Sequence, residues 1–172
     1  ATAAAKAALW GLLNGERLSE VSFRIPEGET MHMKIEEVEI DDSSASACVI
    51  KNAGDDPDVT DKSRITVTVA FAAHDGIRFI GGRGVGTVTL PGMGLPIGEP
   101  AINPVPRAMI ERELKALHPA GLDVTVAIEN GEELATKTFN PRVGVMGGVS
   151  IIGTTGIVRP FSHEAFVEAI RR

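Results

Sequence analysis

The hydrophobic pattern of this chain changes near residue 140, and this change limits the possible folds more than any other feature. Before it, apolar and polar residues alternate in RITVTVAFA (64–72) and in DVTVAI (123–128), which is typical of strands with one buried face. After it, VGVMGGVSIIG (143–153) is apolar without alternation, which is typical of a parallel strand buried on both faces. The chain therefore combines two kinds of sheet.

The residues after this apolar stretch predict a loop and a helix. A glycine- and threonine-rich loop leads to Ser162, which is placed to cap a helix, with Phe161 and Phe166 as a hydrophobic staple. One strand and one helix cannot form a sheet by themselves. We therefore expect an α+β domain over residues 1–139 and, over residues 140–172, the first strand, loop and helix of an α/β domain whose remainder lies outside this chain.

Two helices, three hairpins and short strands are expected within the α+β domain. Thr2 is placed to cap the first helix and Asn103 the second, which has Pro104 in its first turn. In chain order we expect a helix over 2–16, a hairpin over 21–40 with its turn at 26–29, a strand over 44–52, a hairpin of 64–72 with 77–82, a short strand at 86–90, a helix over 103–119, and a hairpin over 123–139 around Asn130-Gly131.

Composition and charge exclude several classes of protein. With 43% apolar and 23% charged residues the chain is typical of soluble globular proteins, and no apolar run reaches the ~20 residues that cross a bilayer. The net charge of −6 argues against a broad nucleic-acid-binding surface. The single cysteine, Cys48, cannot form an internal disulfide, which suggests a cytoplasmic location. The sequence leaves the oligomeric state open.

Four carboxylates lie close together in GDDPDVTD, at Asp55, Asp56, Asp58 and Asp61. Such a cluster can bind a cation or accept a proton. The same residues also suit a polar turn, in which Asp58 or Thr60 caps one turn of helix. The pattern alone is compatible with both interpretations.

Glycines recur in GGRGVGTVTLPG, at Gly81, Gly82, Gly84 and Gly86. Amide groups exposed by glycine can surround phosphate or carboxylate oxygens, with Arg83 as an added contact. No helix follows at once and no Gly-Lys-Ser/Thr is present, so neither a dinucleotide fingerprint nor a P-loop fits. A wide turn between strands is the alternative.

Two Asn-Pro elements are each followed by an arginine: Asn103 by Arg107, and Asn140 by Arg142. Arginines at the ends of elements suit a substrate rich in carboxylates, whereas capping and turn formation explain the asparagines equally well. The four histidines share no ligand spacing, so we expect no metal site, and no covalent nucleophile is evident. Chemistry that works by positioning two ligands fits better, and methyl transfer from a sulfonium donor is one example.

Several of these segments together resemble a known family. AAAKAA, GDDPDVT, GGRGVGTVTLPG, GEPAINPVPRAMI and FNPRVGVMGGVSIIGTTGIVRPFS, in this order, are similar to the CbiD family, the cobalt-precorrin-5B C1-methyltransferases of anaerobic cobalamin biosynthesis. The resemblance implies transfer of a methyl group from S-adenosylmethionine to C1 of a small-molecule corrin precursor, giving cobalt-precorrin-6A. It also implies a first domain similar to the second domain of ribosomal protein S5, followed by a three-layer α/β domain.

The resemblance also implies roles for residues already singled out. Candidates for a general base, or for orienting the ring, are Asp55, Asp56 and Asp58. Candidate contacts for the substrate and its carboxylates are Arg83, Asn103, Arg107, Asn140, Arg142 and Arg159. Candidates for the S-adenosylmethionine pocket are Gly82, Gly84, Gly147, Gly148, Gly153, Thr154 and Thr155.

Two other functions stay open at this point. A non-catalytic module of the same fold would bind a corrinoid precursor without S-adenosylmethionine. A small-molecule kinase of similar fold would bind phosphate with Gly81–Gly86, although the lack of a helix directly after this loop argues against it. In each case we expect any cobalt to arrive within the substrate.

Overall fold

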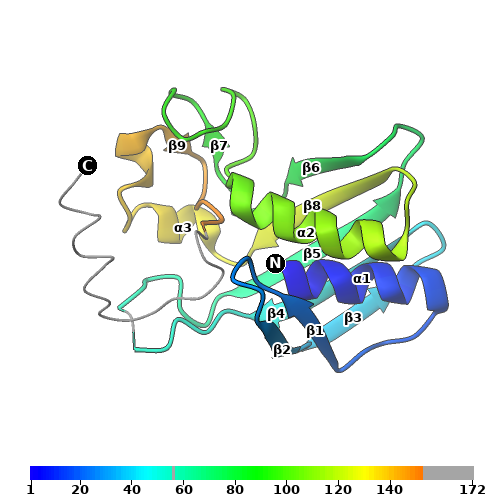
Figure 1. Cartoon of the computed structure of the whole chain (residues 1–172). Coiled ribbons are helices and arrows are strands. Elements are labelled where there is room, and N and C mark those ends of the chain that lie inside the picture. The colour runs from blue at the N-terminus through cyan, green and yellow to red at the C-terminus, as the bar shows by residue number, and fades with distance from the viewer. Residues whose placement is uncertain (56, 153–172) are drawn as a thin grey trace.

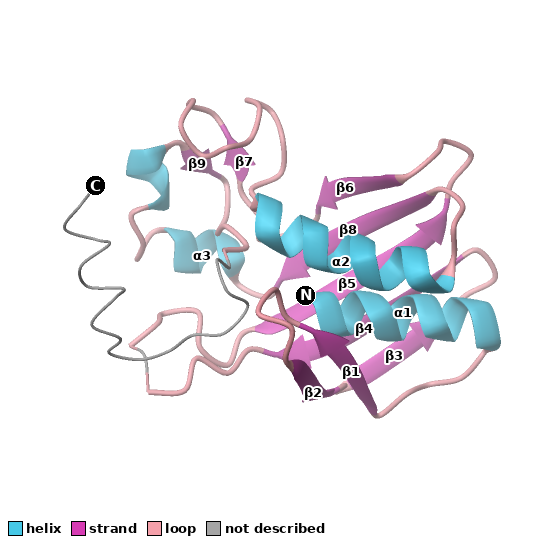
Figure 2. Ribbon diagram, viewed as in Figure 1, coloured by secondary structure: helices cyan, strands magenta, loops and turns pink. Residues whose placement is uncertain are grey.

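A five-stranded mixed sheet with two helices on one face forms the body of the protein (Figure 1, Figure 2). The structure is a computed structural model that describes residues 1–55 and 57–152. Strand order is β3-β4-β5-β8-β6, and neighbours are antiparallel except for β6 and β8. These elements are α1 (Thr2–Asn14), β3 (Glu37–Ile40), β4 (Ser44–Ile50), β5 (Arg64–Phe71), β6 (Ile77–Gly81), α2 (Pro104–Leu117) and β8 (Leu122–Ile128). This mixed architecture is consistent with the predicted α+β class.

The first predicted helix is confirmed as α1, which contacts β4 and β5 through its alanines. These alanines are almost wholly buried, and their small side chains let the helix lie close to the sheet. The helix ends at Gly15, whose φ of 68° is left-handed. Its start differs from the prediction: Thr2 is the first helical residue, and Ala1 occupies the capping position without a side-chain hydrogen bond.

The second predicted helix is confirmed as α2, with Pro104 in its first turn. Its buried stripe includes Met109 and Leu114, as the spacing predicts. Asn103 does occupy the capping position, but its side chain makes no capping hydrogen bond. The Nζ atom of Lys6 on α1 lies 3.1 Å from Glu113 Oε2 on α2, so an ion pair joins the two helices.

The predicted hairpin over 21–40 is confirmed in its first part and corrected in its second. β1 (Glu20–Arg24) pairs with β2 (Thr30–Lys34) around the expected turn. The predicted second strand then divides, because the amide of Ile35 still bonds Ser19 whereas that of Glu36 bonds Cys48 of the main sheet. The chain changes partner at this point and continues as β3.

The predicted hairpin of 64–72 with 77–82 is wrong. Both segments are strands, β5 and β6, but β8 lies between them and pairs with each. Every second side chain of β8 is buried, from Leu122 to Ile128, so its inner face belongs at the centre of the sheet. Gly121 permits this insertion because a Cβ atom there would overlap the carbonyl of His74.

The predicted hairpin around Asn130-Gly131 is also wrong, although a turn does occur there. Asn130 is left-handed with a φ of 57°, and the chain continues as helix α3 (Gly131–Ala135) instead of a second strand. This segment forms a helix because Glu132 and Glu133 lie in its first turn, where acidic side chains interact favourably with the helix dipole.

The segment after residue 139 packs against the glycine-rich loop. It forms a 3-10 helix, η1 (Asn140–Val143), and then β9 (Val145–Met146), which pairs antiparallel with β7 (Thr87–Val88). The short strand predicted at 86–90 is thereby confirmed as β7. In the described part Val145 is buried and Met146 is 51% exposed, and burial of 143–153 on both faces within a complete α/β domain stays a prediction. Figure 2 shows β9 beside β7, apart from the main sheet.

Three glycines bring these segments together through backbone contact. A Cβ atom on Gly84 would overlap the carbonyl of Ile128, and one on Gly131 or Gly148 would overlap the carbonyl of Gly84. The amide of Val149 donates to the carbonyl of Gly84 at 2.9 Å. We call these three residues the glycine contact. Within the described part of the chain, no helix has the length and apolar character that crossing a membrane requires.

Replacing Gly84 by alanine should destabilise the fold by at least about 3 kcal/mol, because left-handed strain adds to overlap with fixed backbone. Gly147 is a matched control, since both glycines have a φ of 82° but Gly147 has open space at the Cβ position. We expect Gly147→Ala to cost about 1 kcal/mol. Urea unfolding of the two variants measures the difference, and equal midpoints would contradict the glycine contact.

Candidate functional site

A cavity of about 490 Å³ lies where α1 and α2 begin. Its volume falls within the range of small-ligand sites, roughly 300–1,000 Å³. Its wall is formed by the start of α1, the first turns of α2, the β1–β2 hairpin, the end of β4 with the loop that follows, Ile65 of β5, Ile128 of β8, and residues 149–152. We call it the helix-start cavity.

The wall is mostly apolar, with a few polar side chains. The hairpin contributes Phe23, Met31 and Met33, and α2 contributes Met109. The polar side chains are those of Thr2, His32, Lys51, Asn52, Thr60, Ser63 and Ser150. No aspartate or glutamate belongs to the wall as the described residues form it. The cavity can therefore hold an apolar body with an anionic or hydrogen-bonding group.

Lys51, at the end of β4, supplies the ammonium group of the wall. Its Nζ atom lies 2.5 Å from Asp58 Oδ2 and 2.5 Å from Thr60 Oγ1. The other oxygen of Asp58 accepts from the amide of Thr60 at 2.8 Å and from its hydroxyl at 2.7 Å. Burial raises the pKa of Asp58, but the bonds from Lys51 and Thr60 outweigh it and leave that pKa below its ordinary value. Asp58 is thus held as a carboxylate behind the ammonium group.

The electrostatic potential at the starts of the helices is unfavourable to cations. Both helices present the positive ends of their dipoles here, since α1 begins at Thr2 and α2 at Pro104. A ligand group placed at this end of the cavity is therefore expected to be anionic.

A family model described as CbiD matches residues 1–160. The chain belongs to the CbiD family. The resemblance drawn from the ordered motifs is thereby confirmed.

Two relatives of this chain from different bacteria share the same protein name. The chain is similar to the cobalt-precorrin-5B C(1)-methyltransferases of Burkholderia cenocepacia (strain HI2424) and Pseudomonas fluorescens (strain Pf0-1), with 50% and 49% identity over 177 residues. These alignments cover 100% of this chain but only 49% and 48% of those proteins. The chain spans about half the length of the curated relatives it matches.

A solved structure shows the same fold. The crystal structure of a cobalamin biosynthesis protein (cbiD) from Archaeoglobus fulgidus is 28% identical and matches with a TM-score of 0.68. The match covers 99% of this chain and 55% of that chain. The fold of this CbiD-family chain is therefore shared with the part of that structure that it matches.

The four aspartates predicted from the sequence do not share one environment. Asp55 is exposed in a turn, and Asp56 lies outside the described residues. Asp58 holds Lys51, and Asp61 accepts from the amide of Ala53 at 2.8 Å. These bonds match the polar-turn interpretation for Asp58 and Asp61. A catalytic role for Asp55, Asp56 or Asp58 stays a prediction, and the lowered pKa of Asp58 makes it a weak base.

The predicted arginines also differ in their surroundings. Arg107 donates from Nε to Ile102 at 2.7 Å and from its two terminal nitrogens to Glu99 and Pro100 at 3.0 Å each, so it braces the loop before α2. The side chain of Arg83 is 91% exposed. Arg142 lies 5.8 Å from the Phe139 ring, and Arg159 is outside the described residues. None of the three described arginines lines the helix-start cavity.

The predicted asparagines lie at the starts of helical turns. Asn103 precedes α2, and its amide bonds the carbonyl of Ile151 at 3.0 Å. Its Oδ1 atom is buried and has no hydrogen-bond partner among the described residues. Asn140 opens η1, and its backbone amide donates to the hydroxyl oxygen of Thr138 at 3.2 Å. Their substrate contacts stay predictions.

The predicted cofactor-binding glycines are mostly enclosed by protein. Gly84 and Gly148 form the glycine contact, and a Cβ atom on Gly82 would lie 2.9 Å from the carbonyl of Val126. Only Gly147 among the described candidates has open space beside it. Close packing therefore accounts for three of these glycines, and their contact with a cofactor stays a prediction. The remaining candidates, Gly153, Thr154 and Thr155, lie outside the described residues.

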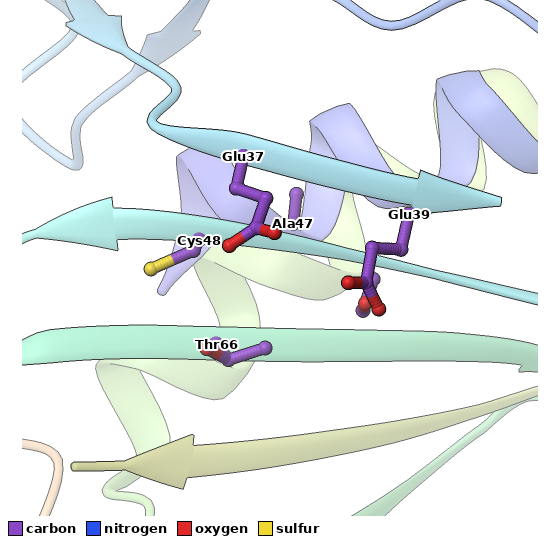
Figure 3. Close-up of a pocket in the computed structure, with 6 residues that line it drawn as sticks. Glu37, Glu39, Ala47, Cys48 and Thr66 are labelled. Carbon is purple, nitrogen blue, oxygen red and sulfur yellow. The ribbon is translucent and has the colours of Figure 1, made fainter.

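A second, smaller hollow of about 220 Å³ lies on the face of the sheet that the helices leave uncovered (Figure 3). Glu37 and Glu39 extend over it from β3, beside Cys48 of β4 and Thr66 of β5. None of the residues predicted for the site lines this hollow. In the part of the chain that the structure describes, no three His, Cys, Asp or Glu side chains are grouped to hold a metal ion.

Sequence reasoning did not single out Lys51 or the hairpin wall. The only signal for Lys51 is its place directly after the apolar end of β4, where the strand leads into a loop. The hairpin residues Met31 and Met33 alternate with polar residues, which predicts a strand but not what the strand covers. Their contribution depends on where the hairpin lies against α2, and this is set by contacts distant in the sequence.

The ion pair of Asp58 with Lys51 makes the free energy of unfolding depend on pH. Because the folded pKa of Asp58 lies below its ordinary value of 3.8, the pairing stabilises the fold above that pH and is lost as the pH falls through the folded value. We expect Asp58→Asn to be less stable than the parent near neutral pH and to lose less stability on acidification. Urea midpoints from about pH 6 to pH 3 test this.

Asp55→Asn serves as the control, because Asp55 is exposed and close in sequence. Its urea midpoints should follow the parent at every pH. If Asp58→Asn also followed the parent, the ion pair would have no part in stability.

Proposed function

We propose that this chain is the first part of an S-adenosylmethionine-dependent methyltransferase that methylates C1 of cobalt-precorrin-5B and gives cobalt-precorrin-6A in cobalamin biosynthesis. The observation that carries the proposal is 50% identity over the whole chain with a cobalt-precorrin-5B C(1)-methyltransferase. Because the chain spans about half of such relatives, the activity belongs to the longer protein. We place the reaction in the cytoplasm.

The proposed domain organisation follows from the same family. Residues 1–139 form a domain similar to the second domain of ribosomal protein S5, and residue 140 begins a three-layer α/β domain. The layer of α1 and α2 on the five-stranded sheet β3-β4-β5-β8-β6 supports the first assignment. The matched region of the family model extends past this boundary, to residue 160.

The role proposed for this chain is to position a ligand. In methyl transfer from a sulfonium, the ring carbon donates an electron pair to the methyl group while the carbon–sulfur bond breaks, and the donor leaves as the neutral thioether S-adenosylhomocysteine. Such a reaction requires both reactants held in line and in contact. The helix-start cavity offers apolar walls, and the described wall holds no carboxylate that would serve as a general base.

The experiment is methyl transfer by a family-length protein that contains this chain, with labelled S-adenosylmethionine and cobalt-precorrin-5B. We expect label in the corrin product. Ser150→Trp, which fills the helix-start cavity, should reduce the rate at least about tenfold, an effect of ~1.4 kcal/mol on the barrier. Ser43→Trp makes the same change in an exposed turn and should leave the rate near that of the parent.

Two results would contradict the proposal in different ways. Absence of labelled product with the unchanged protein would remove the methyltransferase function and favour a non-catalytic corrinoid-binding module. Equal rates for Ser150→Trp and Ser43→Trp would retain the function and place the reaction outside the helix-start cavity.

A further inference from the structure

The wall of the helix-start cavity differs in charge from the protein as a whole. The chain has 23 acidic and 17 basic residues, yet the wall includes an ammonium group and, within the described residues, no carboxylate. Asp58 offsets part of the Lys51 charge from 2.5 Å away, but it does not belong to the wall, so the charged group that a ligand meets there is the ammonium and not the carboxylate. A bound sulfonium centre would therefore lie away from Lys51.

Lys51 retains capacity to bind a ligand. An ammonium group has three N–H donors, and two of them are directed at Asp58 and Thr60, 2.5 Å away in each case. The third has no partner among the residues that the structure describes, and the side chain is 31% exposed. Asp58 and Thr60 fix the position of Nζ, so little side-chain entropy is lost when a ligand binds.

The polar surroundings of Lys51 suit a carboxylate. Ser63 and Ser150 line the same cavity, and their hydroxyl groups form no hydrogen bond to any described residue. A hydroxyl group and an ammonium group can each donate to a carboxylate oxygen. The start of α1, which lines the same cavity, adds the positive end of a helix dipole. These groups lie around an apolar space, so the ligand combines a carboxylate with an apolar body.

We propose that Lys51 binds a carboxylate of the ligand that enters the helix-start cavity. The identity of this ligand rests on the proposed function, in which either of two molecules can supply the carboxylate. One is an acetate or propionate arm of the tetrapyrrole, and the other is the α-carboxylate of the methyl donor. Asp58 and Thr60 act as positioning residues for the ammonium group.

Titration of the 172-residue chain with porphyrins tests the first source. Uroporphyrin carries an acetate and a propionate on every pyrrole ring, whereas coproporphyrin has methyl groups in place of the acetates. We expect uroporphyrin to bind more tightly, and Lys51→Met to weaken it by roughly ten- to a hundredfold, the range of a charge-assisted hydrogen bond. Lys51→Arg should retain part of the affinity.

Lys115→Met is the matched control, because it removes one lysine from the exposed side of α2, outside the cavity. Its affinity for uroporphyrin should equal that of the parent. The unchanged chain gives a measurement that needs no variant: raising the salt concentration should weaken uroporphyrin binding, since the attraction is between charges.

Titration with S-adenosylhomocysteine tests the second source with the same variants. A loss of affinity on Lys51→Met in either titration supports the proposal and identifies whose carboxylate is bound. The proposal is overturned if neither ligand binds the chain, or if both bind the parent and Lys51→Met alike. Circular dichroism spectra and urea midpoints show whether Lys51→Met is folded. If this variant does not fold, the salt dependence of uroporphyrin binding by the unchanged chain tests the proposal instead.

The outcomes also separate this proposal from the proposed function. Uroporphyrin binding that depends on Lys51, combined with no methyl transfer by the family-length protein, supports the carboxylate site and removes the methyltransferase. Methyl transfer at the parent's rate and KM in a family-length Lys51→Met protein retains the methyltransferase and overturns the carboxylate site.

Discussion

The contact of Gly84 with Gly131 and Gly148 is the constraint on which the rest of the arrangement depends. Backbone meets backbone there, and the carbonyl of Gly84 accepts from Val149 at 2.9 Å. No side chain larger than hydrogen fits at these positions, so α3, the glycine-rich loop and the segment around Val149 meet at one fixed distance. That segment continues into Ile151, which lines the helix-start cavity. The glycines thus act on the cavity by placing its wall.

The second organising interaction is the ion pair of Lys51 with Asp58. The pair is neutral as a whole, but only Lys51 belongs to the cavity wall, whereas Asp58 also accepts hydrogen bonds from Thr60. Asp58, one of the aspartates clustered in the sequence, therefore fixes the position of the lysine that lines the cavity. The family model and the longer relatives place the chain itself in the CbiD family.

Patterns confined to a short stretch predicted the elements well. The β1–β2 hairpin, α1 and α2 follow from alternation, alanine content and a proline in the first turn. The prediction of which strands pair failed where a strand distant in the sequence lies between two neighbouring ones. β6 is next to β5 in the sequence, yet β8 lies between them, because its buried alternate residues require a neighbour on each side. Gly131 predicted a turn correctly, but the residues after it favour helix α3.

The sequence by itself determined the family, because ordered motifs along the chain need no knowledge of contacts. It also determined which residue types are available: clustered aspartates, glycines and arginines. Only the tertiary structure decided what each of them does. Arg107 braces the loop before α2, Gly84 packs against backbone, and the cavity is lined by Lys51, which no motif had indicated. The physical reason is that charge, burial and free volume at a site depend on groups far apart in the sequence, and packing alone brings these together.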